Sequence, residues 1–135
     1  MSYVDKRFQV GNYAKDWTEK ILRIVEIKEG GVTAQYANEE RRDVPWQDII
    51  PLPIREDLLD QIGFKTIKER LNPYHREVTV SSIINGRHYH MMGFLYEDKS
   101  LWTFNGMSLR YLHQVQNILY ILEPTIDHQV RCSSL

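Results

Sequence analysis

Two histidines are the residues of this 135-residue chain whose spacing comes nearest to a recognisable chemistry. His88 and His90 are two positions apart in a segment predicted to be a strand, so both imidazoles lie on the same side of it. Such a pair can bind a transition metal, but a metal site needs a third and usually a fourth ligand. Folding would have to bring His75, His128 or Cys132 beside them. Two interpretations therefore stand: a metal-binding pair, or ordinary half-exposed strand histidines.

Other side chains with catalytic potential lack the neighbours that catalysis requires. Asp57 and Asp60, three positions apart on a short predicted helix, can form an acid–base pair, but they also suit a helix that is acidic at its start. The serine pairs at 81–82 and 133–134 have no G-x-S-x-G setting and no adjacent base. The chain has no Walker loop, no G-x-G-x-x-G and no C-x-x-C pair. Motif content therefore disfavours an enzyme and implies no cofactor.

The last predicted helix, about 108–123 and ended by Pro124, has an unusual second face. Between Arg110 and Glu123 the sequence has no Lys, Arg, Asp or Glu. Four polar or aromatic side chains share one face at i, i+3, i+4 and i+7, namely His113, Gln116, Asn117 and Tyr120. This face is expected to form either an internal hydrogen-bonded network or a surface for self-association or a partner. Nothing nearby in the sequence supports a catalytic role for His113.

A tryptophan in a polar segment is the other candidate for partner binding. Trp17 lies in the stretch 13–18, between segments predicted to be strands. Small β-domains often bind peptides or other ligands through aromatic residues on loops. The alternative is that Trp17 folds back and caps the domain. The candidate interaction surface thus comprises Trp17, His113, Gln116, Asn117 and Tyr120.

The balance of charge argues against nucleic acid as the main ligand. Residues 1–54 have eight basic and nine acidic side chains, and residues 55–135 have nine of each. Nucleic-acid-binding domains usually have a basic patch or stripe, whereas Arg41 and Arg42 here stand beside three acidic residues. Two alternatives remain open. One is a nucleic-acid-associated module that uses Arg41, Arg42, Trp17 and Tyr36, and the other is a small metal-dependent hydrolase that uses His88, His90 and His113.

The composition is that of an ordinary globular domain. Apolar residues make up 42% and charged residues 26%, and no window approaches the ~20 apolar residues of a membrane-spanning helix. The N-terminus lacks the apolar core of a secretory signal. A single cysteine, Cys132, cannot form an internal disulfide. We therefore expect a cytoplasmic protein without a membrane segment.

The predicted fold class is α+β, in two subdomains that form one compact unit. Residues 1–50 are expected to form a small SH3-like antiparallel β-barrel from strands near 8–13, 21–27, 32–36 and 43–46. The turn at Gly30-Gly31 offers two residues that tolerate positive φ. Residues 49–54, with two prolines, are expected to form an extended strap against both halves.

Residues 51–135 are expected to form a short helix, an antiparallel sheet and the last helix packed on it. The helix spans 55–62 and Gly63 ends it. The segment 64–71 fits a strand or a helix. Strands follow at 77–84, 87–97 and 101–104, and Asn85-Gly86 marks a tight hairpin between the first two.

Three segments resemble a group of small uncharacterised proteins from Bacteroidetes genomes and their phages. Residues 111–117, followed by Tyr120, are similar to that group's "YLHQLQNLY" ending, Gly11-Asn12 to its opening "GN" strand, and residues 51–64 to its "PIPLTEEWLLKFGF" stretch. Arg55 stands where the group usually has a capping Thr, and residues 123–125 replace its usual Thr-Gly. The resemblance implies an α+β fold and a phage or mobile-element setting, but no activity. We therefore expect a non-enzymatic module that binds a host or phage protein or associates with itself.

Overall fold

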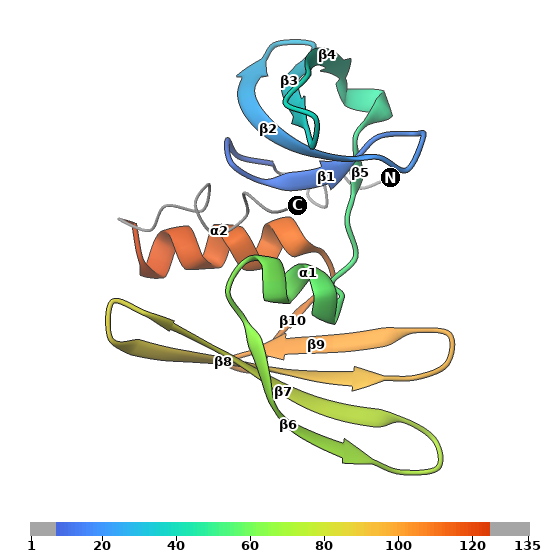
Figure 1. Ribbon diagram of the computed structural model, residues 1–135, viewed down its shortest axis with the longest axis vertical. Helices are drawn as coiled ribbons and strands as arrows, with labels where there is room; N and C mark the ends of the chain where they lie inside the picture. The colour runs from blue at the N-terminus through green and yellow to red at the C-terminus, as the bar shows by residue number, and fades with distance from the viewer. Residues whose placement is uncertain (1–7, 125–135) are drawn as a thin grey trace.

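The computed structural model describes residues 8–124, which form two antiparallel sheets with two α-helices between them (Figure 1). This confirms the predicted α+β class. The first sheet contains β1 (Tyr13–Lys15), β2 (Ile21–Lys28), β3 (Gly31–Tyr36), β4 (Arg41–Pro45) and β5 (Ile50–Pro51). The second contains β6 (Lys65–Leu71), β7 (Arg76–Ile84), β8 (Arg87–Leu95), β9 (Ser100–Phe104) and β10 (Met107–Leu109). The helices are α1 (Glu56–Gln61), α2 (Leu112–Leu122) and the short 3₁₀ turn η2 (Trp46–Asp48).

The first sheet is open and does not close into a barrel. Its strands lie in the order β4-β3-β2-β1-β5, so β4 and β5 form opposite edges. β4 ends at Pro45, and β5 has two residues and also ends at a proline, Pro51. Proline has no N–H to donate to a neighbouring strand, which limits pairing between these edges. The predicted SH3-like barrel is therefore not confirmed.

The hairpin predicted around Gly30-Gly31 is present, but the glycines play a different part from the one expected. β2 and β3 pair from Leu22↔Tyr36 to Lys28↔Gly31. Neither glycine is among those with positive φ. A Cβ on Gly31 would lie 2.1 Å from the carbonyl oxygen of Val44. Gly31 is thus required by the close approach of β4, and not by the turn conformation.

The segment between the two sheets forms the predicted strap. Ile50–Pro51 pairs with β1 in the first sheet. Leu52 and Ile54 then enter the core against the second sheet. The backbone carbonyl of Leu52 accepts a hydrogen bond from the N–H of Leu112 at 2.8 Å, and the N–H of Ile54 donates to the carbonyl of Arg110 at 3.2 Å. The strap therefore joins the start of α2 to both sheets.

The second sheet is a meander in the order β10-β9-β8-β7-β6. The β7–β8 hairpin turns at Asn85 and Gly86, with φ of 52° and 78°, as the Asn-Gly signal predicted. The ambiguous segment before it is a strand, β6, whose side chains are all exposed. The short helix α1 precedes β6, as expected, with its N-cap at Arg55.

The last helix begins later than predicted. Residues 107–109 form β10, and α2 starts only at Leu112. The side chain of Gln114 turns back and accepts hydrogen bonds from the backbone N–H groups of Arg110 (2.8 Å) and Tyr111 (3.0 Å). These bonds satisfy donors at the helix N-terminus and fix its start.

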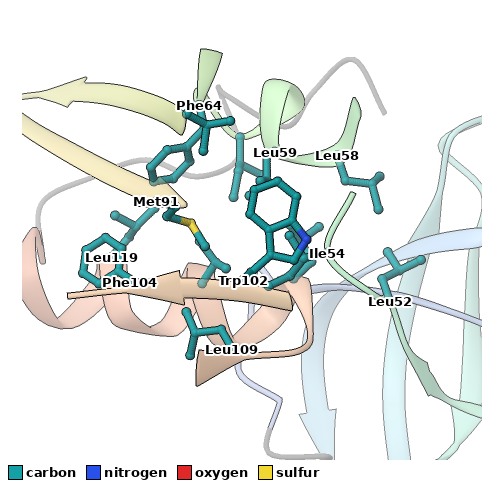
Figure 2. Close-up of a cluster of buried hydrophobic side chains, with 14 of the residues drawn as sticks. Leu52, Ile54, Leu58, Leu59, Phe64, Met91, Trp102, Phe104, Leu109 and Leu119 are labelled. Atoms are coloured by element: carbon teal, nitrogen blue, oxygen red, sulfur yellow. The ribbon is translucent and has the colours of Figure 1, made fainter. Parts of the chain in front are cut away.

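The main core lies between the second sheet and the two helices (Figure 2). Trp102 of β9 is at its centre, beside Leu59 of α1 and Ile54 of the strap. Tyr13 of the first sheet belongs to the same cluster. The two sheets therefore share apolar contacts through the helical layer. Within residues 8–124, no helix has the length and apolar character needed to span a membrane.

Candidate functional site

The polar face of α2 packs against the first sheet. The Oε1 of Gln116 accepts a hydrogen bond from the backbone N–H of Tyr13 at 3.0 Å, and its Nε2 donates to the carbonyl of Gly11 at 3.2 Å. At the next position, the Oδ1 of Asn117 accepts from the Nδ2 of Asn12 at 2.9 Å. The uncharged residues thus supply partners for backbone groups that would otherwise be buried without them.

His113 lies in the same internal layer. Its ring centroid is 4.3 Å from that of Phe8 and 5.8 Å from that of Tyr111, and the side chain is fully buried. Of the four residues that α2 contributes to the expected interaction surface, His113 and Gln116 are thus inside the chain, and Asn117 and Tyr120 are half-buried at the same boundary. The hydrogen bonds of Gln116 and Asn117 to residues 11–13 are of the kind that the internal-network interpretation expects.

Trp17 is placed differently, on the turn between β1 and β2. Its side chain is 72% exposed, so it does not fold back to cap the sheet. The backbone of this turn is closed by two hydrogen bonds, from Asp16 N–H to the carbonyl of Lys20 and from Glu19 N–H to the carbonyl of Asp16, both 3.0 Å. Glu19 has a φ of 71° within it. An exposed indole is therefore carried on a closed, defined turn.

The carboxylate of Asp16 holds this turn in place. Its Oδ1 accepts from the backbone N–H of Thr18 (2.8 Å), the hydroxyl of Thr18 (2.6 Å) and the backbone N–H of Lys20 (3.1 Å). Its Oδ2 accepts from the hydroxyl of Tyr36 at 2.9 Å. Burial by itself raises the pKa of Asp16, but the hydrogen bonds from Thr18, Tyr36 and Lys20 outweigh it and hold the pKa below its ordinary value. The turn is thus built around an ionised, buried carboxylate.

Tyr36 connects the turn to the rest of the sheet. Burial and the hydrogen bond to Asp16 together raise its pKa to about 12, so the hydroxyl stays a donor. The guanidinium of Arg42 lies 5.5 Å from the centre of the Tyr36 ring. The Trp17 turn is therefore connected to β3 and β4 through the contacts of Asp16 with Tyr36 and of Tyr36 with Arg42.

Of the residues named for the nucleic-acid alternative, Tyr36 and Arg42 are connected to the Trp17 turn, and carboxylates lie beside them. Arg42 is paired with Glu40 at 2.7 Å, and Lys15 with Glu19 at 2.7 Å. With Asp16 ionised as well, Lys15 and Arg42 both have acidic neighbours. Phosphate binding depends on uncompensated Lys and Arg, and these two pairs leave less uncompensated positive charge for a nucleic-acid backbone.

The two histidines of the metal hypothesis lie side by side on β8. His88 and His90 are exposed, with ring centroids 6.5 Å apart. Among residues 8–124, no group of three or more His, Cys, Asp or Glu side chains could hold a metal ion. His113 is buried against Phe8, whereas His75 packs on Tyr96 with ring centroids 5.1 Å apart. His128 and Cys132 lie outside the described residues.

The other catalytic candidates are not assembled either. Asp57 accepts hydrogen bonds from Arg55 at 3.1 Å, and Asp60 pairs with Lys65 at 2.6 Å, so the two carboxylates have different partners. Ser81 points to the outer side of β7 and Ser82 to the buried side. The serine pair at 133–134 lies outside the described residues. The described candidates thus stand in separate places.

Sequence reasoning named Trp17 but missed Asp16, which positions it. The signal was available, because an Asp followed two residues later by a Thr is typical of a turn in which the carboxylate accepts the i+2 N–H. The contact between Asp16 and Tyr36 had no such signal, since it joins residues 20 positions apart.

Comparisons with known proteins add no family to this geometry. No family model matches the chain, and no curated protein or solved structure shows a significant similarity to it.

Proposed function

We propose that this protein is a non-enzymatic binding module that docks onto another protein through Trp17. The observation that carries the proposal is the 72% exposure of an indole on a turn fixed by the buried carboxylate of Asp16. Tryptophan is among the residues that contribute most to protein–protein binding. A loop already held in its bound conformation loses little entropy on association.

The surroundings of Trp17 indicate the chemistry of the partner. The indole needs an apolar pocket to fill, while two basic side chains nearby are already paired, Lys15 with Glu19 and Arg42 with Glu40. Exposed pairs of this kind contribute little by themselves. The partner is therefore a protein with an apolar pocket and a mixed-charge rim, and binding should depend only weakly on salt.

The resemblance noted in the sequence suggests that this partner is a host or phage protein. The single cysteine is also consistent with a reducing, cytoplasmic compartment. Both suggestions rest on the sequence, and the docking proposal stands independently of them.

A selection experiment tests the proposal although the partner is unidentified. A random-peptide library is selected against the immobilised full chain, and each enriched peptide is measured on Trp17→Ala and Tyr74→Ala. Tyr74 is the matched control, because it is an 84% exposed aromatic residue on a different turn, between β6 and β7. The proposal expects peptides that lose binding to Trp17→Ala and keep it on Tyr74→Ala.

Two results would contradict the proposal. One is a failure to enrich any peptide sequence, and the other is a set of peptides that bind Trp17→Ala as well as the wild type. A third measurement separates the nucleic-acid alternative: single- and double-stranded DNA bound with a steep loss of affinity at rising salt would favour it.

A further inference from the structure

The side of the second sheet that faces away from the helices is exposed, and its three central strands have few charged side chains there. Figure 1 shows α1 and α2 on the same side of this sheet, and the described part of the chain places no helix or strand over the other side. Inward-facing Val78, Val80 and Met91 are buried. The residues that alternate with the buried ones along β7, β8 and β9 point outward, and three apolar ones are well exposed: Ile83 at 58%, Met92 at 45% and Leu101 at 52%.

The strand register shows how these outward side chains are arranged. One row crosses all five strands, in the order Lys68, Thr79, Met92, Thr103 and Ser108. A second row places Phe94 between Glu77 and Leu101, with Arg70 at the edge. Ile83 lies opposite His88, and Ser81 opposite His90. Apolar side chains therefore alternate with hydroxyls and imidazoles over its centre. We call this outward side of the second sheet the outer face.

We propose that the outer face binds the outer face of a second copy of this chain, forming a two-fold symmetric dimer. The charge distribution selects this occupant. On β7, β8 and β9, the outward positions in register contribute one formal charge, Glu77, whose carboxylate lies 3.2 Å from the ring of His75. When a surface pairs with a second copy of itself, its charged groups come close to groups of the same charge and repel them. A nearly neutral centre therefore favours self-association. The basic residues in register with this face, Lys65, Lys68 and Arg70, lie on the edge strand β6, and Lys65 is paired with Asp60 at 2.6 Å.

The size of the outer face fits a reversible dimer. With strands ~4.8 Å apart and a rise of ~3.3 Å per residue, the face measures about 19 Å by 27 Å. Two such faces would remove about 1,000 Å² from solvent, at the lower end of the range for specific interfaces. The geometry therefore predicts a dimer whose population depends on concentration. This inference concerns a different surface from the Trp17 turn and holds whether or not that turn binds a partner.

Sedimentation velocity of the full chain tests the inference. The wild type, Met92→Glu and Ile27→Glu are compared from about 1 μM to about 1 mM, the range in which small interfaces dissociate. Ile27 is the matched control, since it is 42% exposed on β2 of the other sheet. We expect the wild type and Ile27→Glu to dimerise, and Met92→Glu to weaken dimerisation by about 100-fold, because symmetry buries two unpaired carboxylates. Circular dichroism confirms that each variant is folded.

A wild type that stays monomeric over the whole range would overturn the inference, as would a dimer that Met92→Glu leaves intact. A second measurement does not depend on a disruptive substitution. Met92 lies near the middle of β8, the central strand, so two copies of it would approach each other near the symmetry axis. In a Cys132→Ser background, Met92→Cys should form a disulfide-linked dimer faster than Ile27→Cys. Equal rates for the two variants would count against the outer face as the contact.

Discussion

At the scale of single residues, the turn that carries Trp17 depends on one buried carboxylate. Asp16 accepts four hydrogen bonds, of which two come from backbone N–H groups of the turn itself and one from Tyr36 on β3. Hydrogen bonds to a charged acceptor are stronger than those between neutral groups. Asp16 therefore fixes both the shape of the turn and its attachment to the sheet, while Trp17 itself contributes little to stability.

Replacing Asp16 should reveal this division of roles. Asp16→Ala leaves several buried or half-buried donors without an acceptor, and we expect the free energy of unfolding to fall by about 2 kcal/mol. Trp17→Ala should leave that free energy within about 0.5 kcal/mol of the wild type. Urea denaturation measures both, with Asp98→Ala, an exposed aspartate in the β8–β9 turn, as the control. Equal losses for Asp16→Ala and Asp98→Ala would show that the carboxylate does not hold the turn.

The ionisation of Asp16 gives this contribution a pH dependence. Because the folded-state pKa lies below the unfolded one, the stabilisation is complete above the unfolded pKa and is lost as the pH falls through the folded pKa. The wild type should therefore exceed Asp16→Asn in melting temperature at pH 7, and the difference should shrink below about pH 4. Thermal melts from neutral to acidic pH measure it. A difference that is constant with pH would contradict an ionised Asp16.

At the scale of elements, α2 is the layer that joins the two sheets. Its apolar side lies against the second sheet, and Gln116 on the other side bonds the backbone of Gly11 and Tyr13. The lack of charge on this helix, which was the strongest irregularity in the sequence, follows from burial on both sides. A charged side chain here would lose its hydration without gaining an ion partner.

Gln116 provides the direct test of this layer. Gln116→Leu has a similar size but leaves the N–H of Tyr13 and the carbonyl of Gly11 buried without their partner, which should cost about 2–4 kcal/mol. Gln47→Leu, at an exposed position in η2, is the control and should be nearly neutral. Urea denaturation compares them. A neutral Gln116→Leu would mean that the polar face does not contribute to joining the sheets.

The elements that sequence reasoning predicted correctly are those with local signals. Asn85-Gly86 specifies a tight turn by its own backbone preferences, and the alternation in 32–36 follows directly from one buried face. The start of α2 was misplaced because residues 107–109 pair with β9, a tertiary contact that overrides a helical pattern. The first sheet was expected to close, but its edges are set by Pro45 and Pro51.

The candidate site was predicted only in part for the same reason. The composition of the α2 face was visible in the sequence, but whether the first sheet or another molecule covered it depended on how residues about 100 positions apart meet, as in the 105-residue separation of Asn12 and Asn117. The outer face of the second sheet escaped notice because its register joins five separate strands.

At the scale of the whole molecule, the two sheets are expected to unfold together. Tyr13 of the first sheet and Leu52 of the strap belong to the core cluster of the second sheet. Trp46 reports on the first sheet and Trp102 on the second. In urea, the fluorescence of a variant that keeps only Trp46 and of a variant that keeps only Trp102 should each change in the same transition as the far-ultraviolet circular dichroism. Two separated transitions would show that the subdomains 1–50 and 51–135 fold independently.

Two separate surfaces of the molecule are candidates for binding. We propose that the Trp17 turn on the first sheet binds another protein and that the outer face of the second sheet binds a second copy, while α2 holds the two sheets in one unit. Both candidate binding surfaces present exposed aromatic or apolar side chains, one on a hydrogen-bonded turn and the other on a sheet.

The most direct test of the central claim is the affinity of a library-selected peptide for the wild type and for Trp17→Ala, measured by isothermal titration calorimetry. Removing a central tryptophan from a protein interface typically costs about 2–4 kcal/mol, which corresponds to a loss of about 30- to 1,000-fold in affinity. The account predicts a loss in this range for Trp17→Ala, with an unchanged melting temperature and full affinity retained by Tyr74→Ala. A peptide that binds Trp17→Ala as tightly as the wild type would contradict it.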